Sequence, residues 1–445
     1  MKKKLVLVFI LSATVAFSQE TALLTFNEAV KIALEKNVTL NTQKNQLFSN
    51  QARKLQGYAN YLPNLNAQGF AQRTDGLQID PTTGQGGNIT SDYVQASVNA
   101  NYTLFNGLNR INTLKQNNLQ FDAQTSLVER TKQDVIFNVT SQYLQVLLDQ
   151  ELLKIAQENL NAQKVVLEQM QGLVDAGVRA TADLYTQDAQ VKNLEVTALR
   201  ATVTLENDRA LLAQTLQADP AIRFEVTAPD WTDEYNLDYI QKMSLDSLYT
   251  VAVERRADLK QQKLNVEAFR HGMRANTSGY MPTITLFGSY GSTFFSANPA
   301  SFNDQFKRLN PQTSYGVNLT IPIFDRLQTH SLRAASRVSY DNAKLSEENL
   351  VKTIKIDVKR VYQNFLSAVE SYKASQVQYQ AGELALKTQQ ESYQLGVTTQ
   401  VALALANQIF VQGAASKAQA EVTLIFQRIL LEYALGSLNI DNLLK

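Results

Sequence analysis

The chain matches itself at a constant offset of 219 (280 − 61), and this internal repeat constrains the fold more than any other feature. The match needs no gap, and it aligns residues that mark the ends of structural elements. Five aligned pairs are Tyr61 with Tyr280, Pro63 with Pro282, Gly69 with Gly288, Phe105 with Phe324, and Gly177 with Gly396. A period of this length is far too long for a solenoid repeat. The sequence therefore predicts an internal duplication in which each half is a large assembly of its own.

Long helices are predicted only in the two proline-free stretches, residues 82–219 and 323–445, because a proline inside a helix removes a hydrogen bond and clashes with the preceding turn. Apolar residues recur every seven positions in both stretches, at Val139, Val146, Leu153, Leu160 and Leu167, and at Val358, Phe365, Tyr372, Tyr379 and Leu386. Such heptads favour a coiled-coil seam.

The heptads imply two helical hairpins. We expect a helix over residues 107–171, roughly 100 Å long at 1.5 Å per residue. Gly177 then interrupts the pattern, and a second helix is predicted over residues 181–216. The same succession surrounds Gly396. Each half therefore carries a long helical hairpin with a tight tip.

Segments with a period of two lie ahead of the long helices. Apolar and polar side chains alternate along residues 94–104 and 314–323, which predicts strands with one apolar and one polar face. Their partners are expected at residues 65–72 and 283–294. Residues 76–92 and 296–313, rich in Gly, Asn, Ser, Pro and Thr, are expected to be loops. A soluble sheet packed on helices would show the same alternation.

The N-terminus has the features of a secretory signal peptide. Lysines at positions 2 to 4 precede an apolar run from Leu5 to Phe17, and Ser18 follows it. This run is shorter than the roughly 20 residues of a membrane-spanning helix. A membrane anchor is the alternative. We expect an exported protein, and because no later segment has the length of a membrane helix, any membrane span must consist of strands.

Export together with strands of about ten residues favours a membrane barrel. Four strands cannot close a barrel alone, so copies of the chain must share one, with eight strands from two chains or twelve from three. Only the larger barrel leaves an open lumen. The residues predicted to face the lumen are Gln95, Asn99, Asn101 and Asn318, and those predicted to face lipid are Val94, Val98, Tyr102, Val317, Leu319 and Ile321.

Composition and motifs argue against several classes of protein. The 42 basic and 41 acidic residues nearly cancel, so a nucleic-acid partner is not expected. The absence of cysteine excludes disulfides and a thiol-linked lipid anchor. His271 and His330 have no metal-ligand spacing and are expected on helix surfaces. We find no catalytic set or nucleotide loop, and therefore expect no enzyme, cofactor or metal.

These patterns together resemble the TolC-like family of outer-membrane efflux proteins, over essentially the whole mature chain. Besides the repeated order of elements, the resemblance rests on short motifs that occupy equivalent places in the two halves. They are Tyr61-Leu62-Pro63 and Tyr280-Met281-Pro282 before strands, Leu104-Phe105-Asn106-Gly107 and Pro322-Ile323-Phe324-Asp325 after strands, and Ala176-Gly177-Val178 and Leu395-Gly396-Val397 at the tips.

The resemblance implies an α+β membrane protein and a role in export. The family forms homotrimers with a twelve-stranded barrel in outer-membrane lipid and a coiled-coil helical tunnel through the periplasm. Such a trimer is the exit duct of a tripartite efflux or type I secretion system. Its partners are a periplasmic adaptor (membrane fusion) protein and an inner-membrane pump, either proton-driven (RND) or ATP-driven (ABC). Small molecules are the expected cargo.

The resemblance also carries over to individual residues. Gly177-Val178-Arg179 and Gly396-Val397-Thr398 match the family's adaptor-contacting turns, although each glycine could simply cap its helix. Asp183 matches a position that helps hold the tip closed through polar links, and a solvated surface residue is the alternative. Where some members carry acidic rings, this sequence has Ala402 and Leu405, so an apolar constriction that closes by packing and dewetting is expected.

The predicted organisation has five parts. Residues 1–18 form the signal peptide, 19–217 the first repeat, 218–244 an equatorial linker, 245–436 the second repeat, and 437–445 a C-terminal tail. Trp231, the only tryptophan, is expected to pack against helices in the linker. Two other functions stay open, a soluble periplasmic scaffold or adaptor and a self-sufficient porin. The long helices argue against the porin.

Overall fold

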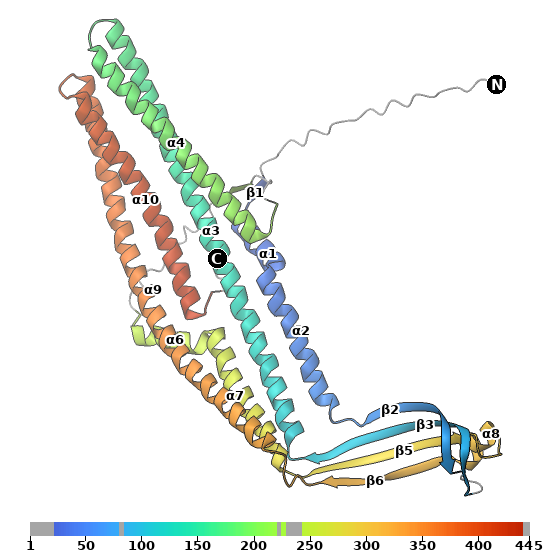
Figure 1. Ribbon diagram of the computed structural model, residues 1–445. Helices are drawn as coiled ribbons and strands as arrows, with labels where there is room; N and C mark the ends of the chain where they lie inside the picture. The colour runs from blue at the N-terminus through green and yellow to red at the C-terminus, as the bar shows by residue number, and fades with distance from the viewer. Residues whose placement is uncertain (1–21, 80–83, 220–223, 228–242, 439–445) are drawn as a thin grey trace, which may run out of the picture. The chain divides into compact units, whose positions relative to one another are not determined.

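A computed structural model of the chain describes residues 22–79, 84–219, 224–227 and 243–438 (Figure 1). The predicted signal peptide, Trp231 and most of the predicted linker lie outside the described residues. The chain divides into two compact units. The helical unit comprises Met1–Asn41, Thr131–Glu254 and Ile356–Lys445, and the sheet unit comprises Thr42–Arg130 and Arg255–Lys355.

Two helical hairpins dominate the helical unit. Helices α3 (Asn109–Asp175) and α4 (Thr181–Leu216) form the first, and α9 (Gln328–Gln394) and α10 (Gln400–Leu435) form the second (Figure 1). Burial confirms the first part of each predicted seam, because Val139, Val146, Val358 and Phe365 are 0% exposed. The later seam residues are less buried: Leu160 is 9% exposed, and the others, Leu153, Leu167, Tyr372, Tyr379 and Leu386, are half-buried. The bounds predicted for α4 are correct, whereas α3 begins and ends slightly later than predicted.

The helices of the two halves follow the offset of the sequence repeat. The first half also contains α1 (Phe26–Lys36) and α2 (Val38–Ala59), and the second half contains α6 (Leu245–Arg255) and α7 (Ala257–Thr277). Each helix of the second half begins at the position that the repeat aligns with the start of its counterpart: α6 with α1, α7 with α2, α9 with α3, and α10 with α4. In the described residues, no helix combines the length and apolar character that crossing a bilayer requires.

A small pair of parallel strands, which was not predicted from the sequence, is hydrogen-bonded to a side chain of α3. Strand β1 (Ala22–Leu24) pairs with β4 (Phe224–Val226). The Tyr143 hydroxyl lies 2.9 Å from the Leu24 carbonyl oxygen and 2.7 Å from that of Thr227, and it accepts the Thr227 N–H at 3.2 Å. The Tyr143 ring is 0% exposed. This one hydroxyl therefore connects both strands to the long helix.

Replacing Tyr143 with Phe is expected to destabilise the helical unit. The ring contact with Phe26, at 5.4 Å between centroids, would remain, and the Leu24 carbonyl would keep the Thr227 N–H at 3.4 Å. The Thr227 carbonyl would lose the hydroxyl, at a cost of about 1–3 kcal/mol. The measurement is the thermal unfolding temperature of the detergent-purified protein. Tyr185→Phe on α4, where the tyrosine is 70% exposed, is the control and should unfold like the wild type. Equal unfolding temperatures for both variants would contradict this role of Tyr143.

The sheet unit holds four antiparallel strands, as predicted. Their order is β2 (Asn64–Ile79), β3 (Gly86–Asn106), β5 (Thr283–Phe295) and β6 (Gln312–Thr320). Proline stands immediately before β2 and before β5, at Pro63 and Pro282. A proline cannot donate to the strand ladder, so it favours the start of a strand. Strands β2 and β6 are the outer strands of the sheet.

The strand register separates the predicted lumen residues from the predicted lipid residues. Directly paired residues share a face of a sheet. Val98 pairs with Tyr290, and Leu286 pairs with both Tyr102 and Val317, which defines an apolar face. Asn99 pairs with Ser289, whose hydroxyl donates to Asn99 Oδ1 at 2.7 Å. On this opposite face lie Gln95, Asn99, Asn101 and Asn318, while Val94, Val98, Tyr102, Val317 and Leu319 lie on the apolar face.

Two predictions about the ends of the strands are wrong. Residues 76–79 and 86–92 were expected in a loop but belong to β2 and β3, whose ladder continues to Ile79 opposite Gly86. Glycine and polar residues dominate positions 84–92, so the alternation of apolar and polar side chains on which the prediction rested is absent there. Strand β6 begins at Gln312, inside the other expected loop, and ends at Thr320. Ile321 therefore lies beyond the strand, because Pro322 offers no N–H to continue the ladder.

A short cap links β5 to β6 at the ends of the strands remote from α7. It contains α8 (Phe302–Asp304) and the π-helix η2 (Gln305–Leu309). Gln305 is 0% exposed, accepts the Phe295 N–H at 3.1 Å, and donates to the carbonyls of Ala300 and Phe295 at 2.7 and 3.2 Å. Asn310 donates to the Thr293 carbonyl at 2.8 Å. These two amides take the place of a strand partner for the end of β5.

The prediction for His271 is also wrong. This side chain was expected on the surface of a helix, but it is 8% exposed, and its Nδ1 lies 3.0 Å from Asn112 Oδ1. Burial, reinforced by the positive charges of Lys115, Arg270 and Arg274, lowers the pKa of His271. A neutral imidazole hydrogen-bonded between α7 and α3 is the result. His330 is exposed, as expected.

Candidate functional site

The two hairpin tips have the same local geometry. Gly177 and Gly396 have φ angles of +74° and +75°, which a residue with a Cβ adopts at a cost. Val178 N–H donates to the Leu173 carbonyl at 2.9 Å, and Val397 N–H donates to the Ser392 carbonyl at 3.0 Å. These are the six-to-one hydrogen bonds of a Schellman motif, and they satisfy carbonyls that the helix ends leave open. The reversal at each tip is therefore fixed by its glycine.

Both tips present apolar side chains to solvent. Val178 is 66% exposed, Val397 is 76% exposed, and Leu395 is 79% exposed. Thr398 is half-buried beside them. Exposed valines on rigid turns are suited to binding another protein, because burying them costs little conformational freedom.

Three polar contacts connect the two hairpins near these tips. The Arg179 guanidinium lies 5.3 Å from the centre of the Tyr393 ring. Gln400 Nε2 donates to Gln187 Oε1 at 3.1 Å, and Asn407 Nδ2 donates to Asn159 Oδ1 at 2.9 Å. We name these the tip links. Arg179 was predicted at a docking turn, whereas sequence reasoning missed the other five residues.

A signal in the sequence could have revealed Gln187. Leu184, Val191 and Ala198 form a seam of α4 at intervals of seven, and Gln187 occupies the second apolar position of that heptad. It is 5% exposed, and its amide also donates to the Gln163 carbonyl at 3.2 Å. A buried amide at a seam position determines which helices pair and in which register, and it does so at some cost in the stability of the coiled coil. Asn159 and Asn407 offer no comparable signal.

The residues predicted for the gate lie close to the tip links. Asp183 is half-buried in the first turn of α4, and within the described part of the chain its carboxylate makes no hydrogen bond or ion pair. Ala402 is half-buried in the first turn of α10, and Leu405 is 56% exposed. Leu405 lines a cavity of about 470 Å³ together with Asn159 and Asn407. The gate roles of these three residues remain predictions.

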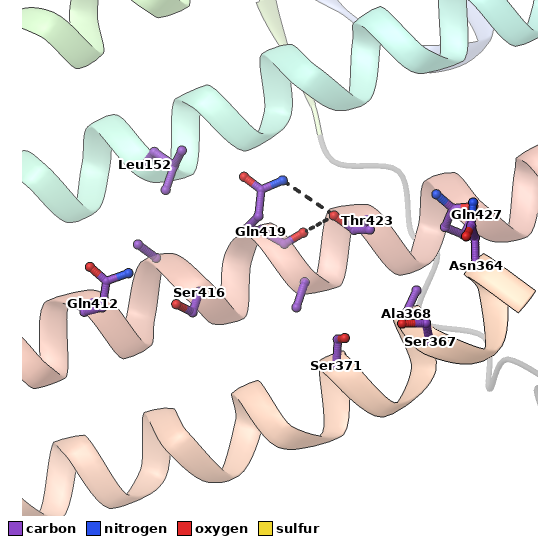
Figure 2. Close-up of a pocket in the computed structure, with 12 residues that line it drawn as sticks. Leu152, Asn364, Ser367, Ala368, Ser371, Gln412, Ser416, Gln419, Thr423 and Gln427 are labelled. Atoms are coloured by element: carbon purple, nitrogen blue, oxygen red, sulfur yellow. Dashed lines mark hydrogen bonds between the residues drawn. The ribbon is translucent and has the colours of Figure 1, made fainter.

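A larger cavity lies farther along the hairpins. It has a volume of about 670 Å³ and is lined by Leu152 of α3 and by residues of α9 and α10 (Figure 2). Its side chains are small or carry neutral polar groups, such as Ser371, Ser416 and Gln419. Gln412 lines both cavities. At this level a polar groove separates the second hairpin from α3, whereas farther from the tips Phe137 of α3 stacks on Tyr433 of α10 with 4.6 Å between the ring centres.

Two carboxyl groups meet inside the first hairpin. Asp149 of α3 is 4% exposed, lies beside Asp208 of α4, and has no hydrogen-bond partner for its Oδ2 atom. Burial, followed by the interaction with the Asp208 carboxylate, raises the pKa of Asp149 to about 7. Gln145 Nε2 donates to Asp149 Oδ1 at 3.2 Å and partly opposes this shift. Among the described residues, histidine and acidic side chains do not gather into a group of three that could hold a metal ion.

This pair makes the stability of the first hairpin depend on pH. The folded chain holds a proton on Asp149 that the unfolded chain releases above its ordinary pKa of 3.8. The free energy of unfolding should therefore fall as the pH rises through the range between that value and about 7. Asp149→Asn is expected to flatten this dependence and to stabilise the protein at pH 8 by an amount on the order of a few kcal/mol.

Thermal unfolding at several pH values tests this expectation. Asp188→Asn removes an exposed carboxyl on α4, the helix that carries Asp208. It is the control and should keep the slope of the wild type. An unchanged slope in Asp149→Asn would show that the pair does not hold the extra proton.

Comparison with known proteins places this geometry in a family. A family model described as Outer membrane efflux protein matches residues 29–217 and again residues 248–437. The outer membrane protein TolC of Salmonella enteritidis is 22% identical over 378 residues, which cover 83% of this chain and 75% of TolC.

Solved structures of outer-membrane channels share the fold. The channel OprN superposes with a TM-score of 0.77 and 19% identity, covering 93% of this chain and 90% of OprN. The open state of the MtrE channel of Neisseria gonorrhoeae gives a TM-score of 0.75 and 18% identity, covering 92% of this chain and 88% of MtrE. With both halves matched by the family model, this chain belongs to the Outer membrane efflux protein family, the TolC-like channels that span the outer membrane and the periplasm.

Proposed function

We propose that three copies of this chain form the exit duct of a tripartite efflux or type I secretion system. The observation that carries the proposal is the four-stranded sheet, whose outer strands β2 and β6 each pair on one side only within the described residues. A sheet in lipid cannot leave such edges unpaired, and four strands are too few to close on themselves. Joining β6 of one copy to β2 of the next gives a barrel of twelve strands. Its apolar face meets lipid and its polar face lines the lumen.

The internal duplication gives this trimer its tunnel. The helices recur at the same offset as the sequence repeat, so each chain supplies two similar hairpins, and three chains supply twelve long helices. In this proposal residues 19–217 and 245–436 are the repeats, and residues 218–244 join them at the equator of the tunnel. The longer helix of each hairpin, α3 or α9, has 67 residues and is roughly 100 Å long, a length suited to crossing the periplasm.

The tips are proposed to be both the docking surface and the gate. A periplasmic adaptor would bury Val178 and Val397, which are 66% and 76% exposed. In the closed duct the tip links hold the second hairpin against the first, and Ala402 and Leu405 narrow the passage. The groove beside α9 and α10 supports this mechanism, because near the tips amide pairs take the place of an apolar core and separate more easily. The aromatic contacts of Phe137 with Phe426 and Tyr433 hold the two hairpins together farther from the tips.

The duct itself performs no chemistry. Small molecules enter from an inner-membrane pump of the RND or ABC type, which supplies the energy and most of the selection. The proposed lumen side chains are polar and uncharged: Gln95, Asn99, Asn101 and Asn318. They give the lumen a hydrated surface without a strong electrostatic potential.

The mass and conductance of the mature protein test the proposal. Light scattering of the detergent-extracted outer-membrane fraction should give the mass of a trimer, and single trimers in a planar bilayer should conduct weakly without an adaptor. A soluble monomer would contradict the shared barrel and favour a periplasmic scaffold. A steadily open pore of high conductance would favour a self-sufficient porin.

A further inference from the structure

We infer that the cap between β5 and β6, residues 301–310, binds the phosphorylated headgroup of a lipid in the outer leaflet of the outer membrane. We name this segment the rim cap. The inference rests on the proposed function, because it requires this end of the sheet to lie at the outer surface of the membrane. The long helices leave from the other end of the strands, which assigns the rim cap to the cell-surface side.

The rim cap is a fixed platform. Its anchor is the buried Gln305 amide, which bonds to Phe295 and Ala300. Ser301 caps the short helix by accepting the Asp304 N–H at 3.1 Å. Asn310 then returns the chain to β5 through the Thr293 carbonyl. Single turns of π-helix are rare and often mark functional sites, since they place side chains where an α-helix would not.

Aromatic side chains continue the lipid-facing surface onto the rim cap. Phe294 pairs with Val94 on the apolar face of the sheet. The Phe302 ring lies 5.0 Å from the Phe294 ring, and the Phe306 ring lies 5.1 Å from that of Phe302. Phe302 is 50% exposed. Aromatic rings at the end of an apolar strand face are typical of the boundary between acyl chains and headgroups.

Two basic side chains directly follow these rings. Lys307 and Arg308 are both exposed, and the Arg308 side chain is 80% exposed. Their one acidic neighbour in the rim cap is Asp304, whose Oδ1 lies 3.8 Å from Arg308 Nη1. Such a long, exposed ion pair neutralises little charge. The segment therefore offers a net positive site at headgroup level, which complements a phosphate and leaves its acyl chains against Phe302.

Equivalent positions elsewhere in the sheet unit lack this combination. The stretch that the repeat aligns with the rim cap, residues 82–91, contains neither an aromatic nor a basic residue. The nearest arginine on the β2–β3 hairpin, Arg73, is bound at both ends of the Asp92 carboxylate, at 2.7 and 2.9 Å. Its charge is already matched. Of the stretches compared, the one in the second half places two exposed basic residues next to aromatic rings, and Asp304 offsets one of their two charges.

Native mass spectrometry of the detergent-purified trimer tests the inference. The probe is short-chain phosphatidic acid, a lipid with a terminal phosphate, compared with phosphatidylcholine of the same chains. Each basic residue contributes about a fivefold gain in binding to an anionic lipid surface, so Lys307→Gln combined with Arg308→Gln should weaken phosphatidic acid binding roughly thirtyfold. Lys344→Gln combined with Lys352→Gln on α9, both exposed, is the matched control and should bind like the wild type.

A second variant separates a lipid site from a plain anion site. Phe302→Ser should weaken phosphatidic acid binding while leaving the affinity of the trimer for inorganic phosphate unchanged. Equal lipid binding in wild type and in the double variant would overturn the inference. Inorganic phosphate that displaces the lipid at equal concentration would also overturn it, since the acyl chains would then contribute nothing. Because every reading is taken on a trimer of verified mass, absence of a trimer would instead count against the proposed function.

Discussion

Val317→Arg is expected to abolish assembly of the trimer in the outer membrane, whereas Asn318→Arg, one residue along β6, should leave the trimer intact. The register places Val317 on the apolar face with Leu286, and Asn318 on the opposite face with Thr285. An arginine facing lipid near the middle of the bilayer costs about 2–4 kcal/mol per chain. Three copies share one barrel in the proposed trimer, so the cost is incurred three times.

The amount of heat-resistant trimer in outer-membrane fractions measures this difference. The two variants add the same charge to neighbouring positions, so each is the control for the other. Asn318→Arg should also shift the ion selectivity of the pore toward anions, because its charge would face the lumen. Equal loss of trimer in both variants would show that the faces of the sheet do not separate lipid from water.

Asn407→Ala is expected to open the isolated channel. The variant removes the tip link to Asn159, a hydrogen bond of 2.9 Å, from all three chains at once. A hydrogen bond of this kind contributes about 1 kcal/mol, so the closed state of the trimer is destabilised by about 3 kcal/mol. This shifts the equilibrium constant between the closed and open states by a factor on the order of a hundred. Single-channel conductance in a planar bilayer should rise accordingly.

Gln408→Ala is the matched control for this variant. Gln408 also carries an amide and is exposed on the next position of α10, and in the described residues it makes no hydrogen bond to the first hairpin. Its conductance should equal that of the wild type. If Asn407→Ala stays as closed as the wild type while the trimer is intact, the tip links are not the gate.

Local patterns in the sequence predicted the long helices well and the strand ends poorly. The heptads place α4 at its observed bounds, because the seam residues are buried wherever the hairpin forms. The outer part of the β2–β3 hairpin has no such pattern, because residues 84–92 are mostly glycine and polar side chains. The β1–β4 pair escaped prediction because it joins Ala22 to Phe224, and three-residue strands so far apart in the chain have no local signature.

The candidate site was predictable only where backbone geometry forces a residue type. Gly177 and Gly396 stand out because their φ angles favour glycine. The tip links depend on which helix faces lie opposite each other, and that follows from tertiary packing. His271 shows the same limit, because its partner Asn112 is 159 residues away in the chain. A lone histidine on an amphipathic helix does not reveal whether a polar partner will meet it.

The two outer edges of the sheet have a genetic consequence. In the proposed trimer every chain pairs with one neighbour through β2 and with the other through β6. A chain with an intact β2 and a defective β6 can therefore still join a barrel, but it prevents that barrel from closing. When such a chain and the wild type are made in equal amounts, only about one trimer in eight contains wild-type chains alone. Alleles that damage one edge should therefore be dominant over the wild type, whereas alleles that stop the chain from folding at all should be recessive.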